Sequence, residues 1–284
     1  MNKSLTSLCY NIDEKEVVLM IHLKKISIDA STDLAYPFSL PLFKNPLEID
    51  INSPVLILVG ENGSGKSTLL KVINSELGLY EIRLTDEVLN KKNKLSTKIR
   101  LTYNPVKPKG FYFESQKFIT YLHYLNKEKD YANEELKRIQ KEYKNASEYA
   151  KTQASTPFHK TIHEMNSLYS KDLNMSSHGE SYLDFFASRI RANQMYLLDE
   201  PETPLSTQNQ LTLLAMIMDA IKKDSQFIIA THSPILMAIP NAQILEVKNN
   251  HIEEVPYNQI ESIGLLKQFI NHPEQFINHL TNKK

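Results

Sequence analysis

Residues 60–67 have the composition and spacing of a loop that binds phosphate groups. They read Gly-Glu-Asn-Gly-Ser-Gly-Lys-Ser, which fits the pattern G-x-x-x-x-G-K-S in full, and Thr68 follows. Glycines allow backbone N–H groups to wrap a phosphate chain, and a helix that starts here adds the positive end of its dipole. We therefore expect ATP to bind this loop, with Lys66 on the β- and γ-phosphates and Ser67 on Mg²⁺. The residues predicted to bind the nucleotide here are Gly60, Glu61, Asn62, Gly63, Ser64, Gly65, Lys66, Ser67 and Thr68.

A second stretch ends an apolar run in two carboxylates. Met195–Leu198 is followed directly by Asp199 and Glu200. On its own this pattern also fits an ordinary solvated strand end, but the phosphate-binding loop favours a catalytic interpretation. We expect Asp199 to hold Mg²⁺, directly or through water, and Glu200 to orient and polarise the attacking water.

A third apolar run, Phe227–Ala230, leads into Thr231, His232 and Ser233. An isolated histidine is more often structural than catalytic. Here it follows a buried strand and lies downstream of the Asp-Glu pair, so we expect His232 to lie beside the γ-phosphate. Together with Lys66 and Glu200 it completes the predicted catalytic set.

The elements that must position these residues alternate between strands and helices. Pro54–Val59 is a continuous apolar run, typical of a strand buried on both faces, and Lys66–Leu77 is predicted as a helix. Thr207–Lys223 is an amphipathic helix, and it precedes a strand at Gln226–Ala230. This order predicts an α/β fold. Further strands are expected at 17–28, 47–51 and 99–103, a hairpin at 242–247 and 251–255, and two short helices at 259–280 broken at Pro273.

The middle of the chain is helical and charged. Residues 126–151 carry Glu, Lys and Tyr at helical spacing with no Gly or Pro. We place a helical insertion at 105–175, within a single domain that covers 1–284. It is either a solvated insertion or an arm that contacts a partner or substrate, and the sequence leaves both interpretations open.

The composition of the chain limits the partners and the compartment that we expect for it. The 284 residues carry a formal net charge of zero, so the overall balance does not call for a nucleic-acid partner. One cysteine, Cys9, excludes a disulfide within the chain and favours a reducing compartment. No apolar run is long enough to span a bilayer, and 1–10 lack the apolar segment of a signal peptide. We therefore expect a soluble, cytoplasmic protein without a membrane partner.

One more motif, residues 176–181, links these pieces to a known family. It reads Ser-Ser-His-Gly-Glu-Ser and precedes the Asp-Glu strand. With the motifs at 60–68, 197–202 and 228–236, it makes the chain similar to the ABC-type ATPases. The closest resemblance is to a group of small stand-alone bacterial ATPases of the AAA/ABC superfamily. The resemblance covers nearly the whole chain and implies an ABC-type P-loop NTPase nucleotide-binding domain with a helical insertion.

The resemblance also implies roles for residues that the motifs alone do not assign. Ser177 and Gly179 would contact the ATP of a second copy, in an ATP-dependent homodimer. Residues 203–206 match the loop that follows the Asp-Glu strand in this family, and Gln116 is the candidate for its glutamine loop. His178 replaces the glycine of the transporter signature, which argues against an ATPase of a membrane transporter.

Three functions fit these observations. The first is an ATPase that dimerises around two ATP molecules and drives or gates a partner protein, such as a nuclease or another effector. Relatives in the wider family serve DNA maintenance and anti-phage defence. The second is an ATP sensor whose slow turnover times the assembly of such a partner, which the intact Glu200 and His232 disfavour. The third is an ATPase stimulated by nucleic acid, for which Tyr103 and a basic run are the candidates. That run comprises Lys91, Lys92, Lys94, Lys98, Arg100, Lys107 and Lys109.

Overall fold

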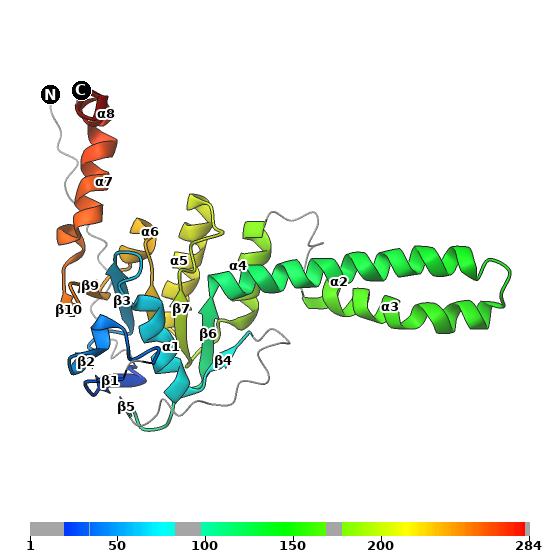
Figure 1. Cartoon of the computed structure of the whole chain (residues 1–284), viewed down its shortest axis with the longest axis horizontal. Coiled ribbons are helices and arrows are strands. Elements are labelled where there is room, and N and C mark those ends of the chain that lie inside the picture. The colour runs from blue at the N-terminus through cyan, green and yellow to red at the C-terminus, as the bar shows by residue number, and fades with distance from the viewer. Residues whose placement is uncertain (1–19, 34, 83–97, 169–177, 282–284) are drawn as a thin grey trace.

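The computed structural model of the chain describes residues 20–33, 35–82, 98–168 and 178–281 (Figure 1). Its centre is a seven-stranded sheet in the order β10-β9-β3-β8-β7-β6-β4. Strand β3 pairs in parallel with β8 and β9, and β7 pairs in parallel with β6 and β8. Only β10 runs antiparallel, against β9. The strands are β3 (Val55–Gly60), β4 (Tyr80–Glu81), β6 (Gly110–Glu114), β7 (Met195–Asp199), β8 (Gln226–Ala230), β9 (Gln243–Lys248) and β10 (His251–Glu254).

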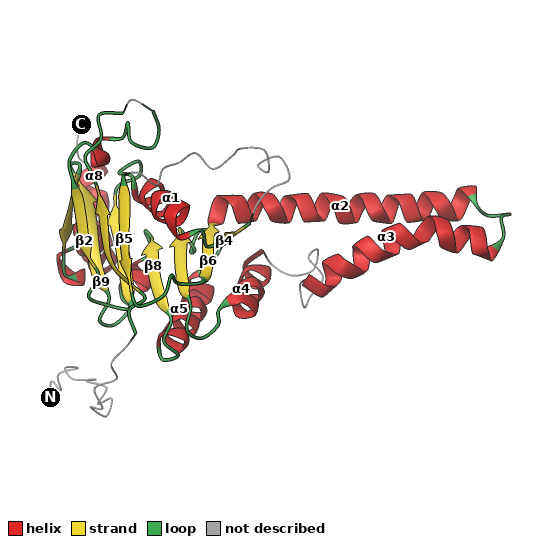
Figure 2. Ribbon diagram, turned by 90° about the horizontal axis from the view of Figure 1, so that it is seen from below, coloured by secondary structure: helices red, strands yellow, loops and turns green. Residues whose placement is uncertain are grey.

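Two hydrophobic cores lie on opposite faces of this sheet. Alternate residues of β3 serve both, because Ile57 joins one core and Leu56 and Leu58 join the other. One face is covered by α1 (Lys66–Leu77) and by a small antiparallel sheet in the order β2-β1-β5. The other is covered by α4 (His178–Arg189) and α5 (Thr207–Ile221) (Figure 2). The small sheet comprises β1 (Leu23–Ile28), β2 (Leu47–Asp50) and β5 (Ile99–Tyr103).

A long helical hairpin projects from the β6 side of the sheet (Figures 1 and 2). It consists of α2 (Ser115–Glu142) and α3 (Glu148–Leu168), which pack along each other. Tyr131 and Phe158 meet across the hairpin with ring centroids 6.3 Å apart. Shorter elements complete the fold, namely the 3₁₀ turns η1 (Pro41–Phe43) and η3 (Tyr257–Gln259) and the helices α6 (Pro234–Met237), α7 (Glu261–Asn271) and α8 (Pro273–Thr281).

Most of the predicted elements are confirmed, several with their predicted bounds. Helix α1 and strands β5 and β8 have the bounds that were expected, and α7 and α8 meet at Pro273. The predicted hairpin is β9–β10, whose turn residues Asn249 and Asn250 have φ of 50° and 65°. The α/β fold with a helical insertion is therefore as expected. Of the stretch 17–28 that was predicted to hold strand structure, Leu23–Ile28 forms β1, and residues 17–19 lie outside the described residues.

The predicted start of the insertion at 105 is wrong. Gly110–Glu114 forms β6 inside the central sheet, so the helical segment begins at Ser115. Gly110 looks like a break in the sequence, but it is required by a close approach between strands. A Cβ atom there would lie 1.7 Å from the carbonyl oxygen of Met195. Strand β4, which pairs with β6 at the sheet edge, was also not anticipated.

Within the described ranges, none of the helices combines the length and the apolar character needed to cross a bilayer.

Candidate functional site

The phosphate-binding loop joins the end of β3 to the start of α1. Its backbone needs glycine at two turns, since Gly63 and Gly65 have φ of 80° and 105°. Gly60 is needed for space, because a Cβ there would lie 2.4 Å from the carbonyl oxygen of Val247. Helix α1 begins at Lys66, so the free N–H groups of its first turn lie at the loop. Such an N-terminus favours a bound anion.

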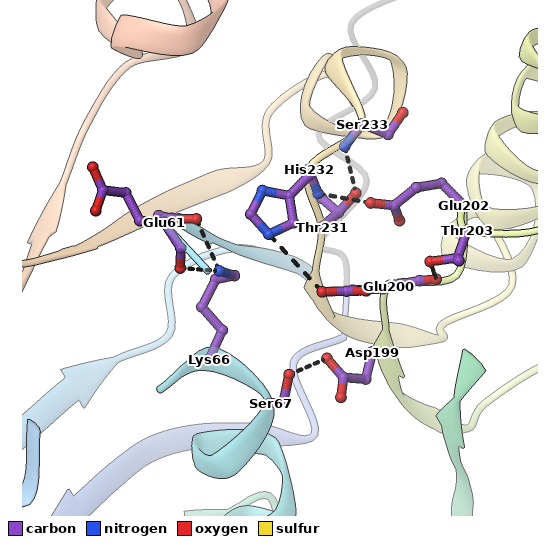
Figure 3. Close-up of polar contacts among 11 residues, drawn as sticks. Glu61, Lys66, Ser67, Asp199, Glu200, Glu202, Thr203, Thr231, His232 and Ser233 are labelled. Atoms are coloured by element: carbon purple, nitrogen blue, oxygen red, sulfur yellow. Dashed lines mark hydrogen bonds and ion pairs between the residues drawn. The ribbon is translucent and has the colours of Figure 1, made fainter. Parts of the chain in front are cut away.

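Lys66 is buried within the loop, with 4% of its surface exposed. Its ammonium donates to the carbonyl oxygens of Gly60 and Glu61, both at 2.8 Å (Figure 3). Burial lowers the pKa of Lys66, and the carboxylates of Glu200 and Asp199 oppose that shift. The loop thus holds a cation whose neutral carbonyl partners could be replaced by the charged oxygens of a phosphate group.

Ser67 and Asp199 come together from distant parts of the sequence. The Ser67 hydroxyl donates to Oδ1 of Asp199 at 2.9 Å (Figure 3). Asp199 is 5% exposed, and burial raises its pKa to about 6. The nearby carboxylates of Glu114 and Glu200 push the pKa in the same direction, while the Ser67 hydrogen bond lowers it. A cation placed here would favour the ionised carboxylate of Asp199 and so oppose the effect of burial.

Glu200 and His232 face each other across the ends of β7 and β8. The Nε2 atom of His232 lies 3.9 Å from Oε1 of Glu200 (Figure 3). Glu200 has φ of 48°, and its N–H donates to the carbonyl oxygen of Ala230 at 2.8 Å. Both side chains are about two-fifths exposed, at 41% and 40%. They can therefore reach a solvent molecule and a ligand in front of the loop.

Glu202 is part of the site, although the motifs alone assigned it no role. Its Oε1 accepts the backbone N–H of His232 at 2.7 Å, which fixes the start of the loop after β8 (Figure 3). Burial raises the pKa of Glu202, while hydrogen bonds to His232 and Thr231 lower it. Its place in the Asp-Glu-Pro-Glu stretch was the signal that could have found it.

Glu114 is a second contributor that the sequence reasoning missed. It pairs with Asp199 in the β6–β7 ladder, and its carboxylate forms an ion pair with Lys71 of α1 at 2.8 Å. Gln116, the candidate glutamine, lies exposed in the first turn of α2. The structure therefore brings Glu114 to α1, and the role of Gln116 stays a prediction. The hydroxyl of Tyr36 lies 3.2 Å from Oγ1 of Thr68, a contact that the sequence also did not indicate.

The signature motif is only partly within the described residues. Ser177 lies outside them, and Gly179 lies in the first turn of α4. Helices α4 and α1 lie on opposite faces of the central sheet (Figure 2). Gly179 therefore lies at the start of a helix that covers the face of the sheet opposite to α1.

The residues present fit ATP and Mg²⁺. Ser64, within the loop that would hold phosphate groups, has a buried hydroxyl with no hydrogen-bond partner. A pocket of about 800 Å³ lies in front of Gly60–Ser64, with His232 on its wall. In the described part of the chain there is no cluster of three or more His, Cys, Asp or Glu for a metal. Mg²⁺ needs none, because it commonly uses one or two protein oxygens together with substrate phosphates and water.

Comparison with known proteins identifies the family to which the chain belongs. A family model described as ABC transporter matches residues 46–203, which is more than half of the 284-residue chain. No curated protein matches the chain. An ATP-binding cassette of an ABC transporter in its ADP conformation has a TM-score of 0.47 and 15% identity, covering 88% of this chain and 99% of that chain. A Pyrococcus furiosus Smc head domain, with an extended coiled coil and bound to the C-terminal domain of ScpA, has a TM-score of 0.45 and 13% identity, covering 88% and 99%. An SMC head domain from Thermotoga maritima has a TM-score of 0.41 and 17% identity, covering 83% and 99%. All three TM-scores lie below 0.5, so the family follows from the match to the family model alone.

Proposed function

The chain belongs to the ABC-type ATPase domains that this family model describes, and we propose that it hydrolyses ATP as a head-to-tail dimer of two copies. Members of the family bind ATP, typically with Mg²⁺, and hydrolyse it in general. The observation that supports the proposal best is the meeting of three elements at one edge of the sheet. The ends of β3, β7 and β8 bring the loop with Lys66, the Ser67–Asp199 pair and the Glu200–His232 pair together.

Each residue has a chemical task in this proposal. Lys66 binds the phosphate chain, exchanging the carbonyl oxygens of Gly60 and Glu61 for phosphate oxygens. Ser67 and Asp199 hold Mg²⁺, which when bound neutralises charge on the phosphates. Glu200 holds the attacking water and accepts its proton as the water oxygen bonds to the γ-phosphorus and the bond to ADP breaks.

His232 and Glu202 act on the position of these groups. In this proposal His232 donates from Nε2 to a γ-phosphate oxygen or holds Glu200 in place, and the 3.9 Å between Nε2 and Oε1 of Glu200 supports the second task. Glu202 holds the backbone of His232 in place, because its Oε1 accepts the hydrogen bond from the N–H of His232 at 2.7 Å. Burial raises the pKa of Glu202, so its charge is costly to maintain, and its hydrogen bonds are what favour the ionised form.

The dimer supplies the residues that one copy lacks. In this proposal Ser177 and Gly179 contact the ATP held by the loop of the second copy. The placement of α4 and α1 on opposite faces of the sheet supports this arrangement (Figure 2). ATP then joins the two copies, and hydrolysis releases them.

We further propose that this cycle gates or drives a partner protein in the cytoplasm, such as a nuclease or another effector. The resemblance to small stand-alone ATPases makes DNA maintenance or anti-phage defence the setting to test first, by analogy alone. A nucleic-acid partner gains little support from the described part of the basic run. Lys98 pairs with Asp33, and Arg100 pairs with Asp29 at 2.7 Å.

Replacing Glu200 by Gln tests the proposal. The amide keeps the size of the side chain but cannot take up the proton, so turnover should fall by about 100-fold or more. ATP should still bind, and the ATP-bound dimer should accumulate, as measured by light scattering with and without Mg²⁺ and ATP. Glu134→Gln on α2 is the matched control, since Glu134 is exposed on the helical hairpin that projects away from the sheet.

Hydrolysis by Glu200→Gln at the parent rate would exclude Glu200 as the group that activates water. Tight ATP binding by a parent chain that does not turn over would instead fit the slow ATP sensor.

A further inference from the structure

The last two helices of the chain are exposed around almost their whole surface. α7 and α8 follow the β9–β10 hairpin and rise beyond the edge of the sheet at which the phosphate-binding loop lies (Figure 1). Ile263 in the first turn of α7 is buried, at 2% exposed. From Leu265 to Thr281, every residue except Phe276 is exposed. The body of the protein therefore buries only the start of this two-helix segment, and Lys267 adds a contact to the ring of Tyr257 at 5.2 Å.

The exposed segment is nevertheless apolar along one side. On α7, Ile263, Leu266 and Ile270 follow one another at spacings of three and four, and on α8, which begins after the break at Pro273, Ile277 and Leu280 are three residues apart. These spacings place apolar side chains on one side of each helix. The spacing is reinforced by a repeat, because Gln-Phe-Ile-Asn-His occurs at 268–272 and again seven positions later at 275–279. The large apolar side chains exposed here are Leu265 at 55%, Leu266 at 39%, Phe269 at 42%, Ile270 at 66%, Ile277 at 51% and Leu280 at 74%.

These helices are too short to be stable by themselves in water. α7 has 11 residues and α8 has 9, and isolated helices below about 12–15 residues are marginal. One ring contact, Phe269 to Phe276 at 5.7 Å, connects the two. Helices this short normally gain their stability by packing an apolar face against another surface. The described part of the chain buries only the first turn of α7. The apolar face of the two helices must therefore pack against a surface outside the described residues.

We propose that this tail face is covered by the same face of a second copy of the chain, in a contact that needs no nucleotide. The tail face is defined by the six exposed residues, Leu265, Leu266, Phe269, Ile270, Ile277 and Leu280. A two-fold pair of copies brings the same face of each chain together, so apolar residues lie opposite apolar residues. None of the six carries a charge that would repel its symmetry mate.

The area of the tail face agrees with a pair of copies. The exposed parts of its six side chains amount to on the order of 500 Å² per copy, and a symmetric pair buries about 1,000 Å², the level that a specific interface must reach. This contact is separate from the ATP-dependent dimer and does not rest on the proposed function. A chain with both contacts would form larger assemblies when ATP is bound than when it is absent.

The test measures the mass of the full chain by light scattering and sedimentation, without nucleotide and with EDTA present. We expect a dimer. Ile270→Glu combined with Ile277→Glu should raise the dissociation constant by about 100-fold or more, because each interface would bury unpaired charge. Gln268→Glu combined with Gln275→Glu is the matched control. It adds the same two charges two positions earlier in each repeat, outside the tail face, and should leave the dimer intact.

Three further checks separate loss of the contact from loss of the fold. Circular dichroism and thermal unfolding must show that the double variant retains the folded core, and the milder Leu280→Ser in the last turn should weaken the dimer in the same direction. Lys66→Ala should remain dimeric, because the contact does not depend on ATP. A parent chain that is monomeric up to about 100 µM would overturn the proposal, whether or not another protein covers the face. So would a dimer lost equally in the control variant, or one that forms only with ATP.

Discussion

The buried carboxylate of Asp199 should lower the free energy of unfolding, and binding of a metal ion would require this carboxylate. Its carboxyl is 5% exposed, and its pKa is about 6 against an ordinary value of 3.8. At 1.36 kcal/mol per pH unit, ionising this group in the folded protein costs about 3 kcal/mol. Asn has nearly the same shape, and its side-chain oxygen can still accept the hydrogen bond from Ser67. Asp199→Asn should therefore stabilise the protein in the absence of ligands by about 2–3 kcal/mol at pH 7.5.

The pH dependence of this gain has a defined sign. Because the pKa is higher in the folded than in the unfolded chain, the folded chain binds more protons between about pH 4 and pH 6. Stability due to Asp199 therefore falls as the pH rises through that window and is lowest above it. The gain from Asp199→Asn should be absent below about pH 4 and complete above about pH 6.5. In melting temperature, the full gain corresponds to roughly 5–10 °C for a protein of this size.

Chemical or thermal unfolding at a series of pH values, in EDTA and without nucleotide, measures this effect. Asp219→Asn is the matched control, because Asp219 is exposed on the surface of α5. Adding Mg²⁺ and ATP should reverse the order, since the parent gains a metal ligand that the variant lacks. A gain of the same size at pH 4 and pH 7.5, or none at pH 7.5, would refute the view that burial makes this carboxylate costly.

Two further predictions follow from the contacts of the loop and its neighbours. Lys66→Ala should abolish measurable ATP binding in a direct binding assay while leaving the chain folded, because the ammonium that would meet the β- and γ-phosphates is lost. Unchanged ATP affinity would remove Lys66 from that role. Glu202→Ala should lower kcat by about 10-fold or more with little change in KM, because the backbone of His232 loses the acceptor of its 2.7 Å hydrogen bond. Steady-state kinetics separates this outcome from a general loss of ATP binding, which would raise KM instead.

Local patterns predicted the position of the phosphate-binding loop because the residues that define it are consecutive in the sequence. The strand before it, the loop and helix α1 were all expected from one stretch, and the bounds of α1 are confirmed. Strand β6 was missed because Gly110 interrupts an apolar pattern, and the reason for that glycine is the backbone of Met195, which is distant in sequence.

The residues of the site that were not predicted were missed for the same reason, namely contacts between segments distant in sequence. Glu114 approaches Lys71, and Glu202 approaches the backbone of His232, only once β6, β7 and β8 lie side by side. Propensity and spacing do not report such contacts, because they arise from the strand order of the sheet. Ser177 is a further step removed, since its proposed ligand is bound to a different copy of the chain.

The most direct test of the account mixes two inactive variants, Ser177→Arg and Lys66→Ala. Each alone should fail to hydrolyse ATP, the first because a bulky side chain fills the seam between copies and the second because its loop cannot bind ATP. In a head-to-tail dimer of the two, one site has both halves intact and the other has both halves altered. We expect the mixture to recover hydrolysis that neither variant shows, in proportion to the heterodimer found by mass measurement. A mixture that contains the heterodimer yet shows no hydrolysis would contradict an ATP site shared between two copies.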